Sequence, residues 1–200
     1  ALRDTLGRKS VARQLYLEPL ARRFVASVDG LGQPNPPTSM WLLKPAPATL
    51  ALTKPRRGGD APVIAAANAR RYQPFLRWLE RIDTAQALRL YQRLYPLLQQ
   101  AYIEQGHPDG HFNDRLIEVI DQLLATPAPA GPLRLKPVSP RPSRSATTPP
   151  QPRYEFADPA LEALSTGQKT LLRMGPQNAS RLKARLRAWR AGLVQLEQPR

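Results

Sequence analysis

The last third of the chain constrains the fold most, because two consecutive helices with defined ends are recognisable there. Asp158 followed by Pro159 is typical of a helix start, since an aspartate side chain accepts hydrogen bonds from the first N–H groups and proline suits the first turn. We expect this helix to end at Gly175, in the left-handed conformation of a C-terminal cap, and the next to begin at Pro176. These residues therefore predict a packed helical domain.

The helix that follows Pro176 is predicted to pack through one narrow apolar stripe. The stripe residues recur at helical spacing and are Leu182, Leu186, Trp189, Leu193 and Leu196. The basic residues fall off the stripe, where we expect them in solvent or available to a partner, and they are Arg181, Lys183, Arg185, Arg187 and Arg190. This pattern favours the solvated side of a core helix over the alternative, a DNA-recognition helix.

Helical periodicity also predicts five helical segments upstream of these two. Two of them lie within residues 2–30, and the others lie near residues 69–82, 83–102 and 112–126. Short apolar runs predict strands at residues 48–53 and 63–66, and again at residues 133–136 with 154–156 as their expected partner. Both strand pairs are expected to be antiparallel.

The helix near residues 83–102 has apolar residues on two sides. One stripe contains Leu88, Tyr91, Tyr95, Leu98 and Tyr102, and the other contains Leu90, Leu94, Leu97 and Ala101. A helix of this kind is typically central and covered by neighbours on both sides, which also favours core positions over a ligand groove for the tyrosines. Asp83 is the expected N-cap, with Gln86 as its capping-box partner, and Pro96 is expected to kink or split the helix.

Length and composition favour a single domain over residues 1–200, and the helical periodicity predicts that it is mainly α-helical. A chain of 200 residues, 42% of them hydrophobic, suffices for one sizeable core. Its 23 prolines are clustered, so we expect flexible proline- and glycine-rich loops at about residues 31–47 and 139–152. The predicted fold has about seven helices and a small antiparallel β element.

Charge and cysteine content narrow the function classes. The formal charge of +15 favours acidic partners such as nucleic acid, anionic lipid or an acidic polymer, although a merely soluble, self-repelling surface is equally compatible with it. The absence of cysteine excludes disulfides, thiolate metal sites and cysteine nucleophiles. The sequence contains neither an apolar run of about 18–20 residues nor a recognisable signal peptide after Ala1.

The turn between the last two helices is the best candidate for a binding site. The N–H groups at the start of a helix favour anions, and basic and amide side chains gather around this turn. The candidate residues are Lys169, Arg173, Asn178 and Lys183. The alternative is that these groups serve internal carboxylates such as Glu162.

Other chemical sites are disfavoured. His107 and His111 have a spacing that can hold zinc on a helix, but Pro108 intervenes, so surface histidines are the better interpretation. Ser165 lacks the glycine-flanked turn of a nucleophile. Three carboxylates suggest acid–base chemistry, but helix capping and the helix dipole explain them better; they are Glu155, Asp158 and Glu162. We therefore predict no catalytic residue, no metal and no cofactor.

Several stretches of the chain resemble a bacterial protein family of unknown function, DUF3014. They are residues 89–102, 106–112, 154–162 and 168–179, with weaker likeness at 22–25 and 71–72. The resemblance implies an N-terminal membrane-spanning helix and a proline-rich spacer before this domain, and hence a location at the periplasmic face of the inner membrane. The family has no established activity, so it implies no catalytic role. The stretch at 139–152 and the histidines at 107 and 111 depart from the family pattern.

We therefore expect a non-enzymatic interaction module of the bacterial envelope, binding a protein or an acidic polymer through a basic surface. A nucleic-acid-binding domain that uses the basic C-terminal helix is the alternative, and a hydrolase of envelope polymers is the third interpretation. Contact with a membrane is expected only through an anchor outside these 200 residues. The sequence does not predict an oligomeric state.

Overall fold

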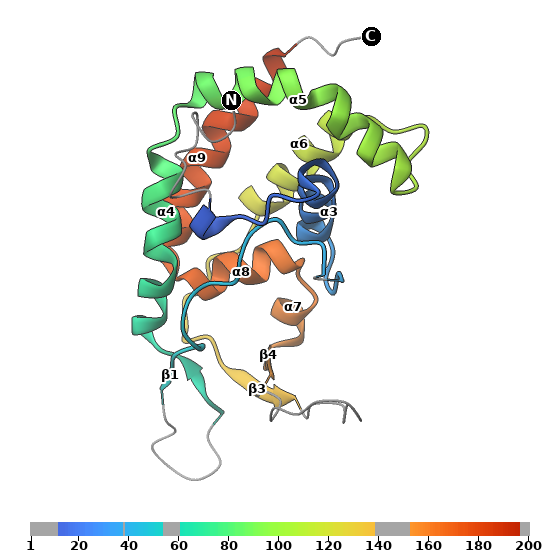
Figure 1. The fold of residues 1–200 in the computed structure, drawn as a ribbon. Helices are drawn as coiled ribbons and strands as arrows, with labels where there is room; N and C mark the ends of the chain where they lie inside the picture. Colours follow the sequence, from blue (N-terminus) through green and yellow to red (C-terminus); the bar gives the residue numbers. More distant parts are fainter. Residues whose placement is uncertain (1–11, 38, 54–60, 139–152, 197–200) are drawn as a thin grey trace.

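Helices form most of the fold, and in Figure 1 they lie above two small β pairs. The computed structural model describes residues 12–37, 39–53, 61–138 and 153–196. The helices with defined bounds are α3 (Leu20–Gly32), the 3₁₀ helix η1 (Ala66–Tyr72), α4 (Gln73–Glu80), α5 (Thr84–Glu104), α6 (Phe112–Leu124), α7 (Pro159–Glu162), α8 (Thr166–Met174) and α9 (Pro176–Gln195). The prediction of a mainly helical fold with a small antiparallel β element is confirmed.

Both predicted strand pairs are present. Strand β1 (Leu52–Thr53) pairs with β2 (Val63–Ile64), and β3 (Leu135–Val138) pairs with β4 (Arg153–Phe156), each in antiparallel orientation. An isolated bridge between Val63 and Arg134 links the two pairs. Leu135 lies opposite Phe156, and both side chains are fully buried against Leu172 of α8. The strands therefore form an apolar floor beneath α8.

The two predicted loops differ in what the structure describes. Residues 139–152 lie outside the described residues. Residues 33–51 connect α3 to β1, and Leu43 within them forms an isolated β-bridge with Leu15. The prediction that the whole chain forms one domain stays a prediction.

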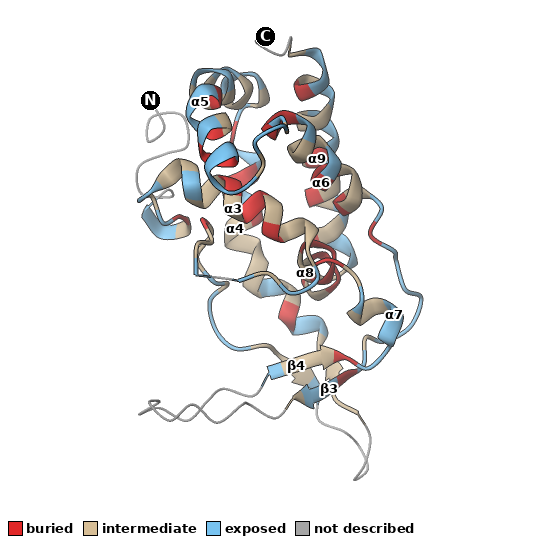
Figure 2. Ribbon diagram, turned by 90° about the vertical axis from the view of Figure 1, so that its right-hand side faces the viewer, coloured by how far each residue is buried: buried red, intermediate tan, exposed pale blue. Residues whose placement is uncertain are grey.

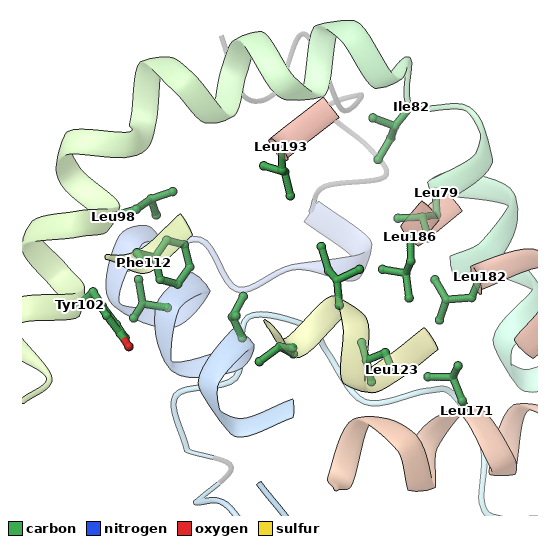
Figure 3. Packing of buried hydrophobic residues seen from close by; sticks show 14 of the residues in the cluster. Leu79, Ile82, Leu98, Tyr102, Phe112, Leu123, Leu171, Leu182, Leu186 and Leu193 are labelled. Atoms are coloured by element: carbon green, nitrogen blue, oxygen red, sulfur yellow. The ribbon is translucent and has the colours of Figure 1, made fainter. Parts of the chain in front are cut away.

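The main core lies where α3, α4, α5, α6, α8 and α9 face one another. Figure 2 shows the buried residues along the facing sides of α3, α6, α8 and α9. Val25, Leu76 and Phe112 are completely buried, and in Figure 3 Phe112 lies beside Leu98 and Tyr102. The expectation that the α5 tyrosines belong to the core is confirmed for Tyr95 and Tyr102, which are buried.

The predicted apolar stripe of α9 is confirmed. Leu182, Leu186 and Leu193 are buried, and Figure 3 shows them directed toward the core. Trp189 and Leu196 are partly buried against the same cluster. Since about 1.5–3 kcal/mol accompanies the burial of each large apolar side chain, this stripe holds α9 on the body of the molecule.

Helix α5 matches its predicted N-cap and differs from the prediction in the burial of one residue, Leu97. Pro96 does not split it, because the helix is continuous from Thr84 to Glu104, but Figure 1 shows the helix changing direction between its two halves. The expected N-cap is confirmed, since the Asp83 side chain accepts from the backbone N–H of Gln86. The prediction that neighbours cover both sides fails only at Leu97, which is 57% exposed; in the same stripe Ala101 is buried and Leu94 packs against the main core.

The helix predicted between Asp158 and Gly175 is in fact two helices. Asp158 caps the short α7, as expected, and accepts from the N–H of Ala160. A second start follows at Ser165, whose hydroxyl accepts from the N–H of Gln168 while the Gln168 side chain accepts from the N–H of Ser165. Gly175 has the expected positive φ of 83°, but its ψ of 159° is extended, so the predicted left-handed helical cap is wrong. The chain therefore straightens for one residue before α9 begins.

Candidate binding surface

Lys169, the first of the predicted site residues, is buried inside the fold. Its side chain is 5% exposed and its Nζ lies 2.7 Å from Glu162 Oε1, while a second bond reaches the Glu162 carbonyl oxygen at 3.1 Å. The other carboxylate oxygen of Glu162 accepts from the backbone N–H of Phe156. One ion pair therefore ties α8 to α7 and to β4, which corresponds to the alternative that the sequence left open for this lysine.

Arg173 lies one turn further along α8 and is partly buried. Its guanidinium carbon lies 5.0 Å from the ring centre of Phe156, and Nη2 donates to the Tyr154 carbonyl at 3.4 Å. Burial lowers the pKa of Arg173, and the nearby Tyr72 and Glu162 oppose this shift. Burial raises the pKa of Tyr72, because in both residues it disfavours the charged form. The structure thus brings Arg173 and Lys169 together around Glu162 and Phe156.

The other two predicted residues serve separate backbone acceptors. Asn178 is buried and donates to the carbonyls of Ala69 and Met174, which fixes η1 to the α8–α9 turn. Lys183 points to the other side of α9 and donates to the carbonyl of Thr126 at 2.7 Å. The four side chains therefore do not form one open cluster, and a role for them in anion binding stays a prediction.

The basic residues of α9 are mostly engaged with neighbouring helices. Arg181 binds both carboxylate oxygens of Glu80, at 2.6 and 2.7 Å, and Arg190 binds Asp121 of α6 in the same two-pronged way. Arg185 donates to the carbonyl of Ile82 and stacks over Trp189. The expectation that these cations lie merely in solvent is therefore wrong for all three. The partners of these arginines are distant in sequence, so no local sequence pattern could predict the contacts.

Arg181 should control the titration of Glu80. Its hydrogen bonds hold the pKa of Glu80 below the ordinary value of 4.5, so the stabilisation from this pair is present above the unfolded pKa and is lost as the pH falls through the folded one. We expect Arg181→Met to move the pKa of Glu80 back toward 4.5, measured by carboxyl NMR titration. Because both side chains are exposed, unfolding should become easier by less than about 1 kcal/mol. Arg187→Met is the matched control, and an unchanged Glu80 midpoint in Arg181→Met would contradict the assignment.

The groups considered for metal binding or catalysis have identifiable surroundings. Among the described residues, no group of three or more His, Asp or Glu side chains is arranged to hold a metal ion. His107 stacks on Tyr102 with ring centres 4.3 Å apart. Ser165 is buried as the cap of α8. Within the described part of the chain, every helix is too short or too polar to cross a membrane.

Helices α4 and α5 carry exposed arginines that form no ion pair with any described carboxylate, and the sequence reasoning missed them. Arg77 and Arg81 lie at the end of α4, and Arg89 and Arg93 lie one turn apart on α5. Within the described ranges none of these four forms an ion pair. One sequence pattern could have indicated them: Arg89 and Arg93 are four residues apart, on the side of the helix opposite the predicted core stripe.

A comparison with protein families places these features in a known group. The model of the family described as "Protein of unknown function (DUF3014)" matches residues 20–190, from the first residue of α3 into α9. No curated protein and no solved structure matches the chain significantly. The match covers the β pairs, the α8–α9 turn and the arginines of α4 and α5. The chain therefore belongs to the DUF3014 family.

Proposed function

We propose that this chain is a non-enzymatic interaction module that binds an acidic protein or polymer through its exposed arginines. The single observation that carries the proposal is the set of exposed arginines on α4 and α5 that lack carboxylate partners among the described residues. Of the 30 basic residues in the chain, 24 are arginine. Arginine is enriched at protein interfaces whereas lysine is depleted, because its planar fork binds carboxylates in two places and is more weakly hydrated.

The surroundings of the candidate reactive groups support a binding role over a catalytic one. Asp158 and Ser165 cap helices, and Glu162 is held by Lys169 and the Phe156 N–H. A general acid or base has to reach a substrate, and a capping or buried paired group is already committed. The engagement of Arg181, Arg185 and Arg190 with α4 and α6 likewise disfavours α9 as a DNA-recognition helix.

The proposed setting is the periplasmic face of the inner membrane, and what supports it is the family resemblance. The complete protein would carry an anchor before this domain. Protease treatment of spheroplasts tests the setting, because a periplasmic domain is digested and a cytoplasmic one is protected.

Salt-dependent binding of an acidic polymer tests the proposed function. We expect labelled polyglutamate to bind at about 0.01 M salt, where charges interact over about 30 Å, and to bind much more weakly at about 0.15 M, where the range is about 8 Å. Fluorescence anisotropy measures both, with polyglutamine as the neutral control. Equal binding of both polymers, or no binding of polyglutamate at low salt, would reject the proposal. Duplex DNA that binds far more tightly than polyglutamate would favour the nucleic-acid alternative.

A further inference from the structure

The side of α5 that faces away from the core combines charge with exposed apolar surface. Residues three and four apart lie on the same side of a helix, so eight exposed residues between Arg89 and Glu104 share this side. We call them the α5 outer face: Arg89, Gln92, Arg93, Pro96, Leu97, Gln100, Ile103 and Glu104, the last of which is already bound by Arg22. The opposite side is buried through Tyr95, Leu98 and Tyr102. Figure 2 shows exposed residues along α5 beside its buried ones.

The apolar part of this face is unusual for the molecule. Among the described residues, the exposed large hydrophobic side chains are Tyr16, Leu97, Ile103 and Val194, and two of these four lie on the α5 outer face. Leu97 is 57% exposed although it belongs to an apolar stripe that a neighbour normally covers. Single exposed apolar residues need no explanation. Here two of them share one helical face with Arg89 and Arg93, and this combination of apolar and basic residues supports an interaction surface.

Pro96 interrupts the backbone hydrogen bonding of α5 on the same face. Proline has no N–H, so it provides no hydrogen bond to the carbonyl of Gln92, four residues earlier. Gln92, Pro96 and Leu97 are all exposed, and α5 changes direction between its two halves.

The two arginines of the face determine the charge of its partner. Arg89 and Arg93 are four residues apart on one helix, where like charges repel, and no described carboxylate pairs with either. A partner with carboxylates one helical turn apart would remove this repulsion. A partner with a leucine-type side chain further along would cover Leu97 and Ile103.

We propose that the α5 outer face docks an amphipathic acidic helix of a partner protein, with its carboxylates on Arg89 and Arg93 and its apolar residues on Leu97 and Ile103. The proposal rests on the proposed function and gives it a place and a partner chemistry. Two helices can pack with their side chains interleaved along such a face. A phosphate backbone would use the arginines alone, so the contribution of Leu97 separates a protein helix from nucleic acid.

The test uses the 200-residue chain and two labelled alanine-rich helical peptides. Both carry glutamates one turn apart, and one has leucines where the other has glutamines. Two variants alter the α5 outer face: the double variant Arg89→Glu with Arg93→Glu, and the single variant Leu97→Gln. The matched control is the double variant Arg134→Glu with Arg153→Glu. Its two arginines are also exposed and form no ion pair within the described ranges. Circular dichroism checks that each variant keeps its helices, and anisotropy measures peptide affinity.

We expect the double reversal on α5 to weaken binding of the leucine peptide by about tenfold or more, because two attractions become repulsions, while the control changes it by less than about threefold. Leu97→Gln should weaken the leucine peptide by about fivefold and leave the glutamine peptide unchanged. Equal losses in the α5 and control variants would overturn the docking site while leaving the proposed function intact. Absence of binding by either peptide would overturn both. Insensitivity to Leu97→Gln, with displacement of the peptide by duplex DNA, would assign the face to nucleic acid instead.

Discussion

Replacing Glu162 by alanine should destabilise the fold by about 3–5 kcal/mol, the usual result of removing one partner from a buried ion pair. The Lys169 side chain is 5% exposed, so its ammonium group would remain in a poorly solvated place without a counter-charge. The backbone N–H of Phe156 would lose its acceptor at the same time. Urea unfolding followed by circular dichroism measures the change in the free energy of unfolding.

A double replacement separates the ion pair from the space it fills. Glu162→Ala with Lys169→Met removes both charges, and we expect it to recover much of the stability lost in Glu162→Ala, because apolar replacement of a buried pair is often neutral. Glu155→Ala is the control at an exposed pair, where Lys136 and Glu155 keep 58% and 41% of their side chains in solvent, and it should cost less than about 1 kcal/mol. A Glu162→Ala variant as stable as Glu155→Ala would contradict the buried-pair assignment.

Phe112→Ala should be comparably damaging, with a loss of about 3–5 kcal/mol and a fall in Tm of about 10 °C. The Phe112 ring is completely buried and lies within 6 Å of the rings of Phe24 and Tyr102, at centre distances of 5.9 and 5.6 Å. Its removal leaves a cavity among α3, α5 and α6, which cannot close without moving a helix. Differential scanning calorimetry measures the fall in Tm.

Leu97→Ala is the matched apolar truncation on α5, and we expect it to change stability by less than about 0.5 kcal/mol because Leu97 is mostly exposed. Similar losses from Phe112→Ala and Leu97→Ala would contradict the assignment of one residue to the core and the other to the surface. The same pair of variants shows whether later binding effects at Leu97 reflect recognition and not altered folding.

The features that depend on neighbours in sequence were predictable. Three such features depend on spacings of a few residues, and the structure confirms each of them. They are the N-cap at Asp83, the helix start at Asp158 and Pro159, and the apolar stripe that begins at Leu182. The start of α8 could also have been predicted, because Ser165 followed three residues later by Gln168 is a capping-box pattern. It was overlooked because the apolar spacing continues through the break at residues 163–165.

The features that depend on distant partners were not predictable. Arg181 meets Glu80, and Arg190 meets Asp121, across separations of 101 and 69 residues. The sequence shows charges but not which helices lie side by side, so the cations of α9 looked available when they were engaged. The exposure of Leu97 could not be predicted for the same reason. An apolar stripe indicates that a neighbouring element packs on it, but not whether that element belongs to this chain.

The contacts of α7 and α8 with β4 have a consequence for self-association. The outer rim of a small sheet presents unpaired N–H and C=O groups, onto which a strand of another molecule can add. On β4 the outward N–H of Phe156 is taken by Glu162, and the outward carbonyl of Tyr154 accepts from Arg173. Side chains thus occupy two positions that an incoming strand would need, which disfavours strand addition at the β4 edge of the β3–β4 pair.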